Sequence, residues 1–368
     1  MTEAVIVDTG RLVKIDGKRS LPAMYVRLGG ISLLRRQVEA LKAAGFNRVV
    51  FISRESAENI DRALNRPTPV SDGDFCFRVV NYGDYESIKN LASGSSLIVP
   101  SDMFLTVPLV RLIKGGMSEK PRYEGPIIFI RTREDVERVE EYLYQSLFSP
   151  TDSFLTRKIN RKVSIAITRR LSSLPLHPNH ITIFNFILGV TGGLLLFCRS
   201  HTVTIIGTLL FLLSSILDGC DGELARLRYQ RSRFGGLLDV VTDNIVHWVV
   251  FSGLTYRSVT ISGFLPYGVL GLSLIFSSIA AFLFSLYAST WGDRGCRPSA
   301  GLLFSESPLS ELSPDSGILD RIANRDFAYL LVVLSILGRL EWFLLVGGFG
   351  APIFAFLLFR SLKLRGVL

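Results

Sequence analysis

The chain has 368 residues, a formal net charge of +9 and 48% hydrophobic residues, and this length allows two domains. The positive charge suits an anionic membrane surface or phosphorylated ligands, and no basic cluster interleaved with aromatic residues predicts nucleic-acid binding. The four cysteines are scattered without C-x-x-C spacing, which argues against a disulfide framework and against a zinc knuckle. Charged residues dominate up to about Arg170 and most long apolar runs follow, so we expect a soluble domain before a membrane domain.

Residues 1–150 alternate between short apolar runs and helical patterns, which predicts an α/β doubly wound soluble domain. The expected strands cover residues 4–7, 49–53, 96–100 and 126–130, and the expected helices cover residues 33–44 and 133–147. The N-terminus lacks the charged and apolar segments of a signal peptide. We therefore expect this domain to stay in the cytoplasm.

Residues 151–175 have the pattern of an amphipathic helix. Apolar residues recur every three or four positions from Leu155 to Leu174, and lysines and arginines fill many of the positions between them. This pattern predicts an interfacial helix in the headgroup layer, and the alternative is an ordinary helix packed on the soluble domain. Because apolar segments follow at once, we favour the interfacial helix.

Residues 176–368 predict an all-α polytopic membrane domain of six transmembrane helices. The apolar segments cover residues 179–197, 202–217, 234–254, 261–287, 327–337 and 342–359. The second segment is too short to span hydrocarbon alone, so we expect its helix to continue through Arg226 and line a wet cavity. The last two segments could instead form a hairpin that does not cross.

Lysine and arginine are distributed unequally between the two sides of this arrangement. One side carries the basic amphipathic helix, the arginines of residues 226–233 and 294–325, and the basic C-terminus. The other side carries only Arg199, Arg257 and Arg339. The positive-inside rule places the first side in the cytoplasm. We therefore expect a multi-pass plasma-membrane protein whose active site and N-terminal domain are cytoplasmic.

Four aspartates lie where the second and third apolar segments meet a polar turn. Asp218 and Asp221 are three residues apart, and Asp239 and Asp243 are four apart, so each pair shares one face of a helix. The polar segment 227–234 can reverse the chain, which would bring both pairs to one membrane surface. Carboxylates beside hydrocarbon are costly, and four of them would repel unless divalent cations lay between them. Oxygen-only ligands favour Mg²⁺ or Mn²⁺ over zinc.

Small residues accompany the aspartates. Gly222, Ala225 and Gly235 leave room for a flat base and a diphosphate, and Arg226 adds a planar cation that can meet a phosphate. Three alternatives remain open: acids that merely cap helix ends, an ion transporter, and a membrane-anchored protein whose soluble domain is the active part. An ion route does not need these small residues, so we favour a site for a phosphorylated ligand.

The pattern D-x2-D-G-x2-A-R-x8-G-x3-D-x3-D over residues 218–243 resembles the signature of the CDP-alcohol phosphotransferase family at all eight fixed positions. The resemblance implies transfer of a substituted phosphate group from a CDP-alcohol to an acceptor alcohol, with release of CMP, in phospholipid biosynthesis. A Pro-Asn followed by Thr at the start of the first span also resembles the family. The expected nucleotide-binding residues are therefore Gly222, Ala225, Arg226, Gly235, Asn179 and Thr182.

The resemblance also implies a two-ion centre with Mg²⁺, or with Mn²⁺ in its place. Asp218, Asp221 and Asp239 would hold one ion, Asp221, Asp239 and Asp243 would contribute to the second, and Asp243 would be the general base. The family further suggests a homodimer. The acceptor alcohol can itself carry a phosphate, and the candidates to bind it are Arg228, Arg231, Arg233, Arg297 and Arg325. Alternatively, these arginines contact lipid headgroups.

The N-terminal domain distantly resembles the sugar-phosphate nucleotidyltransferases through Pro22, Gly29-Gly30 and Ser101-Asp102, where Asp102 sits at an expected metal-binding position. It departs from them at the nucleotide loop, because Val7–Arg11 has one glycine and Ala23 stands where a lysine is usual. We therefore expect a degenerate domain. The order of the two domains resembles the bifunctional inositol-phosphate cytidylyltransferase/di-inositol-phosphate phosphate synthases. Di-inositol-phosphate phosphate synthesis from CDP-inositol is thus the alternative to a CDP-diacylglycerol donor.

Overall fold

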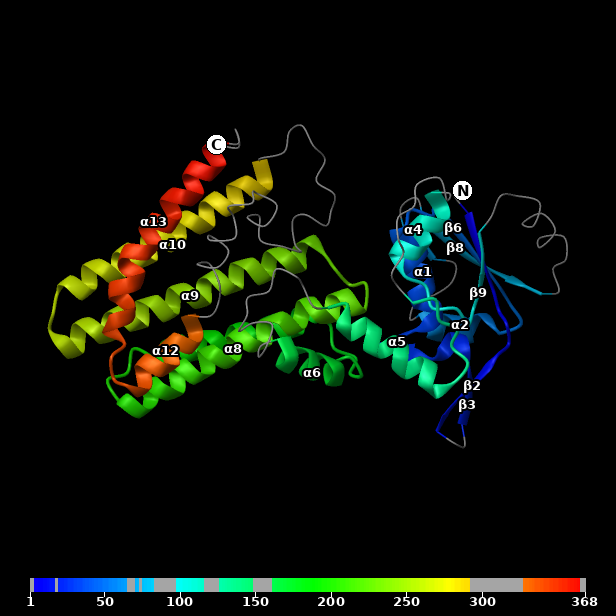
Figure 1. Cartoon of the computed structure of the whole chain (residues 1–368), viewed down its shortest axis with the longest axis horizontal. Helices are drawn as coiled ribbons and strands as arrows, with labels where there is room; N and C mark the ends of the chain where they lie inside the picture. Colours follow the sequence, from blue (N-terminus) through cyan, green and yellow to red (C-terminus); the bar gives the residue numbers. More distant parts are fainter. Residues whose placement is uncertain are drawn as a thin grey trace. The chain divides into compact units, whose positions relative to one another are not determined.

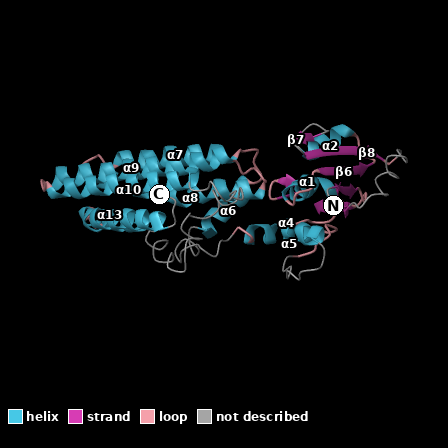
Figure 2. Cartoon of the chain, turned by 90° about the horizontal axis from the view of Figure 1, so that it is seen from above, coloured by secondary structure: helices cyan, strands magenta, loops and turns pink. Residues whose placement is uncertain are grey.

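The structure is a computed structural model that describes residues 3–16, 19–64, 70–72, 75–82, 97–115, 126–147, 161–291 and 327–364. The chain forms two compact units. The N-terminal unit comprises Met1–Leu147 with Leu227–Tyr229, and the helical unit comprises Phe148–Arg226 with Gln230–Leu368. Figures 1 and 2 show that the strands belong to the N-terminal unit.

The N-terminal unit is built on a five-stranded sheet in the order β7-β8-β6-β1-β9. Its parallel strands are β1 (Glu3–Val7), β6 (Arg48–Ser53), β8 (Phe75–Asn81) and β9 (Leu97–Pro100), and β7 (Val70–Asp72) is an antiparallel edge. The apolar runs are buried, as Ala4 and Phe51 illustrate at 0% exposure. The predicted parallel α/β architecture is therefore confirmed.

Helices and small hairpins complete this unit. The helices are α1 (Leu33–Ala43), α2 (Ala57–Leu64), α4 (Val107–Gly115) and α5 (Arg133–Gln145). The hairpins are β2 (Leu12–Asp16) with β3 (Arg19–Pro22) and β4 (Arg27–Leu28) with β5 (Ile31–Ser32), and the 3-10 turn η1 covers Ala23–Tyr25. Strand β1 lies between β6 and β9, which makes the crevice at the carboxyl ends of β1 and β9 a topological switch point.

The predicted strand over residues 126–130 is wrong. Within this segment Phe129 makes an isolated antiparallel bridge to Met103. The N–H of Phe104 donates to the carbonyl of Ile128 at 2.8 Å, and the N–H of Ile130 donates to the carbonyl of Asp102 at 2.7 Å. The segment thus runs beside the loop that follows β9 instead of joining the sheet. A short apolar run alone does not distinguish these two arrangements.

The helical unit contains seven helices within the described residues. They are α6 (Arg161–Leu171), α7 (Pro178–Leu195), α8 (His201–Leu227), α9 (Arg233–Ser262), α10 (Pro266–Trp291), α12 (Phe327–Ile336) and α13 (Glu341–Leu364). Four segments are long and apolar enough to cross a membrane, namely His201–Leu227, Phe234–Ser262, Pro266–Phe284 and Glu341–Arg360. Among the residues that the structure describes, four of the six expected spans are therefore long and apolar enough to cross.

Helix α8 continues through the acidic motif, as predicted, and ends at Leu227. Tyr229 adopts a left-handed φ of 55°, and the N–H of Gln230 donates to the carbonyl of Ala225 at 2.9 Å. This is the pattern that ends many helices, with tyrosine in the position usually held by glycine. Helix α9 then begins after Ser232, whose hydroxyl accepts a hydrogen bond from the N–H of Gly235 at 2.9 Å.

Glycines bring α7 into backbone contact with its neighbours. A Cβ on Gly192 would lie 2.8 Å from the carbonyl oxygen of Gly207 in α8, and a Cβ on Gly207 would lie 2.7 Å from that of Gly192. On α9, a Cβ on Gly253 would lie 2.7 Å from the carbonyl oxygen of Gly193. Small residues at helix crossings are typical of membrane proteins. These contacts fix α7 against both helices that carry the aspartates.

We expect Gly192→Val to destabilise the helical unit by ~1–3 kcal/mol, because the added atoms would meet backbone that cannot move aside. The thermal midpoint of the purified protein in detergent measures this loss. Gly350→Val is the matched control, since a Cβ on Gly350 in α13 meets nothing within 4 Å. Equal midpoints for the two variants would contradict the packing described above.

The buried face of α6 differs from the predicted apolar stripe. Val163 is 41% exposed, whereas Ser164 and Thr168 are 2% and 0% exposed. Ile167 and Leu171 pack against a cluster that includes Cys220 and Leu224 of α8. Spacing alone did not predict this difference, because two of the buried positions hold hydroxyl residues. Residues 151–160 lie outside the described part of the chain, and the interfacial location of the helix stays a prediction.

Candidate metal centre and nucleotide cavity

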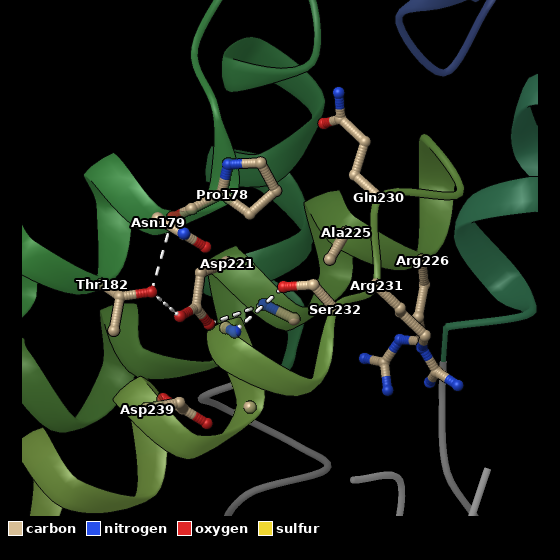
Figure 3. Close-up of a pocket in the computed structure, with 13 residues that line it drawn as sticks. Pro178, Asn179, Thr182, Asp221, Ala225, Arg226, Gln230, Arg231, Ser232 and Asp239 are labelled. Carbon is tan, nitrogen blue, oxygen red and sulfur yellow. Dashed lines mark hydrogen bonds between the residues drawn. The ribbon is translucent and has the colours of Figure 1, made fainter. Parts of the chain in front are cut away.

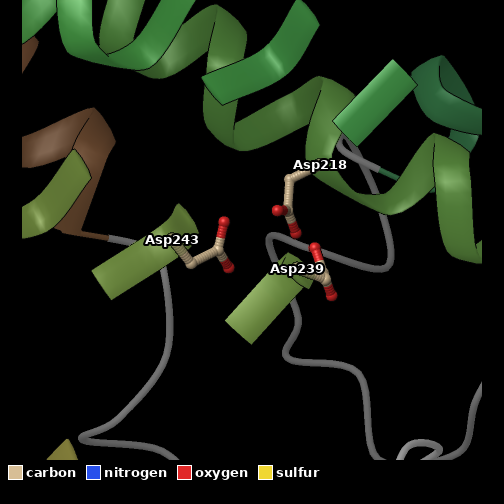
Figure 4. A group of neighbouring side chains, drawn as sticks. All are labelled: Asp218, Asp239 and Asp243. Atoms are coloured by element: carbon tan, nitrogen blue, oxygen red, sulfur yellow. The ribbon is translucent and has the colours of Figure 1, made fainter. Parts of the chain in front are cut away.

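Three carboxylates converge from two antiparallel helices. Asp218 comes from α8, and Asp239 and Asp243 come from consecutive turns of α9. Each offers one oxygen, and these oxygens all lie within 4.8 Å of one another. Figure 4 shows the three side chains pointing toward a common point. The predicted convergence of acids from both helices is therefore present.

The donor set fits a divalent cation that prefers oxygen ligands. The group contains carboxylates alone, which suits Mg²⁺ or Mn²⁺ better than zinc. Three negative charges at this spacing repel one another, and a cation between them removes that cost. The residues present therefore fit the expected metal.

Asp221 lies beside this group instead of within it. Its Oδ2 accepts a hydrogen bond from the hydroxyl of Thr182 in α7, and its Oδ1 accepts one from the N–H of Gly222 at 2.6 Å (Figure 3). Three residues turn an α-helix by about 300°, so Asp221 is rotated ~60° from Asp218. The structure thus faces Asp221 toward α7, and its expected role as a ligand shared by two ions stays a prediction.

A cavity of about 290 Å³ adjoins the carboxylates. It is lined by Asp221 and Asp239. It is also lined by all six residues that the sequence predicts to bind a nucleotide, Asn179, Thr182, Gly222, Ala225, Arg226 and Gly235. The first two turns of α7, the last turns of α8, the segment 230–232 and the first two turns of α9 form its walls (Figure 3). The structure therefore brings the predicted residues together in one cavity.

The two motif glycines serve different purposes. A Cβ on Gly222 would meet nothing within 4 Å, so glycine here keeps part of the cavity open. A Cβ on Gly235 would lie 3.0 Å from the hydroxyl of Ser232 and 3.1 Å from Oδ1 of Asn179. Glycine at this second position lets the first turns of α7 and α9 approach. Both are consistent with a flat ligand between the helices.

Sequence reasoning missed part of the lining. Pro178, Gln230, Ser232 and Gly236 also face the cavity. The Oε1 atom of Gln230 is buried and makes no hydrogen bond within the described structure. Ser232 carried a usable signal, because serine just before an apolar run is a common helix N-cap. Gln230 carried none, since its place follows from the way α8 ends.

The structure describes three of the five arginines expected to bind an acceptor phosphate. Arg231 lines the cavity. Arg228 belongs to the N-terminal unit, where burial, together with the like charges of Arg35 and Arg27, lowers its pKa. Arg233 is the first residue of α9. Arg297 and Arg325 lie outside the described residues. Of the predicted set, the cavity therefore includes Arg231.

In the N-terminal unit, side chains that follow β1 pair with side chains that follow β9. The N–H of Thr9 donates to the hydroxyl of Ser101 at 3.0 Å. Nε of Arg11 lies 3.5 Å from Oδ2 of Asp102, a residue that is 2% exposed. The acid expected at a metal-binding position is thus paired with a cation of its own chain. This pairing, together with the single glycine in the loop of residues 7–11, fits the predicted degenerate domain.

Comparison with known families covers part of the helical unit. Residues 175–295 match the family model of the CDP-alcohol phosphatidyltransferases. These residues include α7, α8, α9 and all four aspartates. This part of the chain is therefore a CDP-alcohol phosphatidyltransferase domain, and the predicted family is confirmed for it.

Individual relatives agree with this class. A protein of Archaeoglobus fulgidus named bifunctional IPC transferase and DIPP synthase is 32% identical over 167 residues, or 44% of this chain and 33% of the relative. A phosphatidylinositol phosphate synthase of Mycobacteroides abscessus is 30% identical over 102 residues, or 28% of this chain and 46% of the relative.

A crystal structure of the Mycobacterium tuberculosis phosphatidylinositol phosphate synthase, with CDP-DAG bound, has a TM-score of 0.32 and 23% identity, covering 49% of this chain and 91% of that chain. The match to the bifunctional relative spans about a third of that relative's length.

Proposed function

We propose that this chain is an integral membrane transferase that moves a substituted phosphate group from a CDP-alcohol to an acceptor alcohol and releases CMP, in phospholipid biosynthesis. One observation carries the proposal. Three carboxylates whose oxygens lie within 4.8 Å of one another adjoin a cavity of about 290 Å³ in a CDP-alcohol phosphatidyltransferase domain. Carboxylates that hold divalent cations suit a diphosphate, and small residues leave room for a flat base. A site with both therefore fits a CDP-alcohol better than a site with one of them.

The cavity residues divide the recognition of the donor between them. Gly222 and Ala225 leave space for the cytidine, and Asn179 offers an amide at the rim. Arg226 and Arg231 offer guanidinium groups that can pair with phosphate oxygens. Ile183 and Phe184, one position and two positions beyond Thr182 on α7, are 48% and 61% exposed. Such apolar side chains suit the acyl chains of CDP-diacylglycerol.

Asp218, Asp239 and Asp243 would hold the divalent metal, with Asp221 beside them, and we expect two Mg²⁺ ions or Mn²⁺ in their place. Such ions supply charge neutralisation for the diphosphate as the bond to CMP breaks. Asp243 is the proposed general base. Its carboxylate lies in the same group, so a hydroxyl held there is within reach to give up its proton as it attacks.

The proposed membrane arrangement adds two spans to the four long helices. We propose that α7 and α12 complete six spans. The 18 residues of α7 cover ~27 Å, close to the ~30 Å of bilayer hydrocarbon, and its side chains Ile187 and Leu194 are exposed. Helix α12 has 10 residues and covers ~15 Å, about half of that thickness, so a hairpin that does not cross is the alternative for α12 and α13. The arginine distribution supports a plasma-membrane protein with the cavity facing the cytoplasm, and we expect a homodimer.

The bifunctional relative favours a second candidate. Its name includes DIPP synthase, and this chain also has an α/β unit before its helical unit. Di-inositol-phosphate phosphate synthesis from CDP-inositol is therefore the alternative. The paired Arg11 and Asp102 argue against synthesis of CDP-inositol by this chain. An ion transporter is not favoured, because the acids adjoin a cavity lined by Gly222, Ala225 and Gly235.

The test is a matrix of donors and acceptors. Purified protein in mixed micelles receives CDP-diacylglycerol or CDP-inositol with inositol, inositol phosphate or glycerol phosphate, and CMP is measured. We expect CMP from one matched pair, dependent on Mg²⁺ or Mn²⁺ and stopped by EDTA. CTP with inositol phosphate should release no diphosphate. Absence of CMP in every arm would contradict the proposed transfer, and brisk diphosphate release would contradict the degenerate N-terminal domain.

A further inference from the structure

Behind the cavity, α8 carries a fully buried carboxylate. Glu223 is 0% exposed and lies between the cavity residues Gly222 and Ala225 in the sequence. The hydroxyl of Ser164 donates to Glu223 Oε1 at 2.7 Å, and the hydroxyl of Thr168 donates to Oε2 at 2.7 Å. The two hydroxyls come from consecutive turns of α6. One carboxylate thus binds two turns of a neighbouring helix.

This contact is directional in a way that apolar packing is not. Burying a carboxylate is costly unless hydrogen bonds compensate it, and hydrogen bonds to charged groups are stronger than neutral ones. Both bonds depend on the rotation of α8, because a small turn of the helix would move both oxygens away from their donors. The interaction therefore specifies one orientation of α8 relative to α6.

The same stretch of α8 carries the chemistry on its other side. Asp221, Gly222 and Ala225 line the cavity, whereas Cys220 and Leu224 are buried at 0% exposure and pack with residues of α6. The thiol of Cys220 also donates to the carbonyl of Ser164 at 3.6 Å. A rotation of α8 away from α6 would therefore shift the cavity wall and the neighbouring carboxylates together.

Helix α6 is also joined to the opposite wall. The short segment 172–177 connects it to α7, whose Pro178 and Thr182 line the cavity. Thr182 in turn donates to Asp221 of α8. The contacts form a closed circuit that runs from α6 along the chain to α7, through Thr182 to α8, and through Glu223 back to α6.

We propose that Glu223, Ser164 and Thr168 form a positioning lock that holds the aspartates and the cavity wall of α8 in register. These three residues contact neither the substrate nor the metal in this proposal, and they act through Asp218 and Asp221. The expected effect on the KM for the CDP-alcohol rests on the proposed function. The expected effect on metal affinity does not depend on turnover.

Thr168→Val removes one donor with little change in side-chain volume, and Thr168→Ser keeps it. We expect Thr168→Val to weaken Mn²⁺ binding roughly 10-fold, the lower end of the range for residues that orient metal ligands, and to raise the KM for the CDP-alcohol more than it lowers kcat. Thr168→Ser should restore both. Mn²⁺ affinity is measured by electron paramagnetic resonance on the full chain, without substrate.

Thr204→Val is the matched control. Thr204 is a buried threonine of α8 at 0% exposure, and its hydroxyl donates to the carbonyl of Ser200 at 2.9 Å in the same stretch of chain. Its replacement should leave Mn²⁺ affinity and KM unchanged. A lower thermal midpoint for Thr168→Val with the Mn²⁺ affinity and KM of the control would overturn the lock and leave a structural contact.

A double-mutant cycle tests whether the residues act as a unit. Adding Thr168→Val to Glu223→Gln should cause less additional loss of Mn²⁺ affinity than Thr168→Val alone, and full additivity would overturn the proposal. If Glu223→Gln does not fold, the comparison of Thr168→Val with Thr168→Ser decides. Wild-type protein that binds Mn²⁺ but releases no CMP would contradict the proposed function, and the lock would still be judged by Mn²⁺ affinity.

Discussion

Asp239→Ala is expected to lower CMP release by roughly a thousandfold or more. Asp239 is the one residue that belongs both to the group of three carboxylates and to the cavity lining. Its loss would remove a ligand from the metal centre and a charge from the cavity wall. Metal ions contribute several kcal/mol to such reactions, and ~1.4 kcal/mol corresponds to a tenfold change in rate.

The measurement is the rate of CMP release at saturating donor and acceptor, with Mg²⁺ varied. Glu341→Gln is a control of the same charge change, because Glu341 begins α13 and lies 3.8 Å from Arg339. It should retain the wild-type rate. Asp239→Ala protein that releases CMP at an ordinary rate would remove Asp239 from the metal assignment.

Gly222→Val should raise the KM for the CDP-alcohol about 10- to 100-fold and leave the thermal midpoint nearly unchanged. The new side chain would enter the cavity, since a Cβ at this position meets nothing within 4 Å. Excess volume in a filled site costs ~1–3 kcal/mol, and each ~1.4 kcal/mol is tenfold in affinity. The protein without ligand has room for the same side chain.

The companion variant Gly222→Ala adds a single methyl group and should give a smaller rise in KM. The affinity for CMP, measured by calorimetry, should fall in the same order, from wild type through alanine to valine. If valine lowered the thermal midpoint but left KM and CMP affinity unchanged, the donor would bind elsewhere.

Much of the site could be predicted because helical geometry and the cost of charge in a membrane act locally. The spacing of Asp239 and Asp243 put both on one face, and the short apolar run before Asp218 required a helix that continued to Arg226. Gly222, Ala225, Arg226 and Gly235 then met in one cavity, because a reversal between α8 and α9 brings their ends together, and Asn179 and Thr182 join them from α7.

Tertiary contacts could not be predicted in the same way. The turn of Asp221 toward Thr182 depends on where α7 lies, and the partners of Glu223 come from a helix more than 50 residues earlier in the chain. The error at residues 126–130 has the same origin. Whether this segment pairs with a strand of the sheet or with the loop after β9 depends on the tertiary structure of the unit.

The glycine contacts of α7 bear on how the protein can work. Carbonyl oxygens of Gly192 and Gly193 lie so close to Gly207 and Gly253 that a single added carbon atom would collide. Helices in such contact cannot slide or rock past one another without separating. Alternating access in transporters depends on that kind of relative movement. A closely packed frame of α7, α8 and α9 instead suits the proposed transferase, whose substrates would reach a stationary cavity.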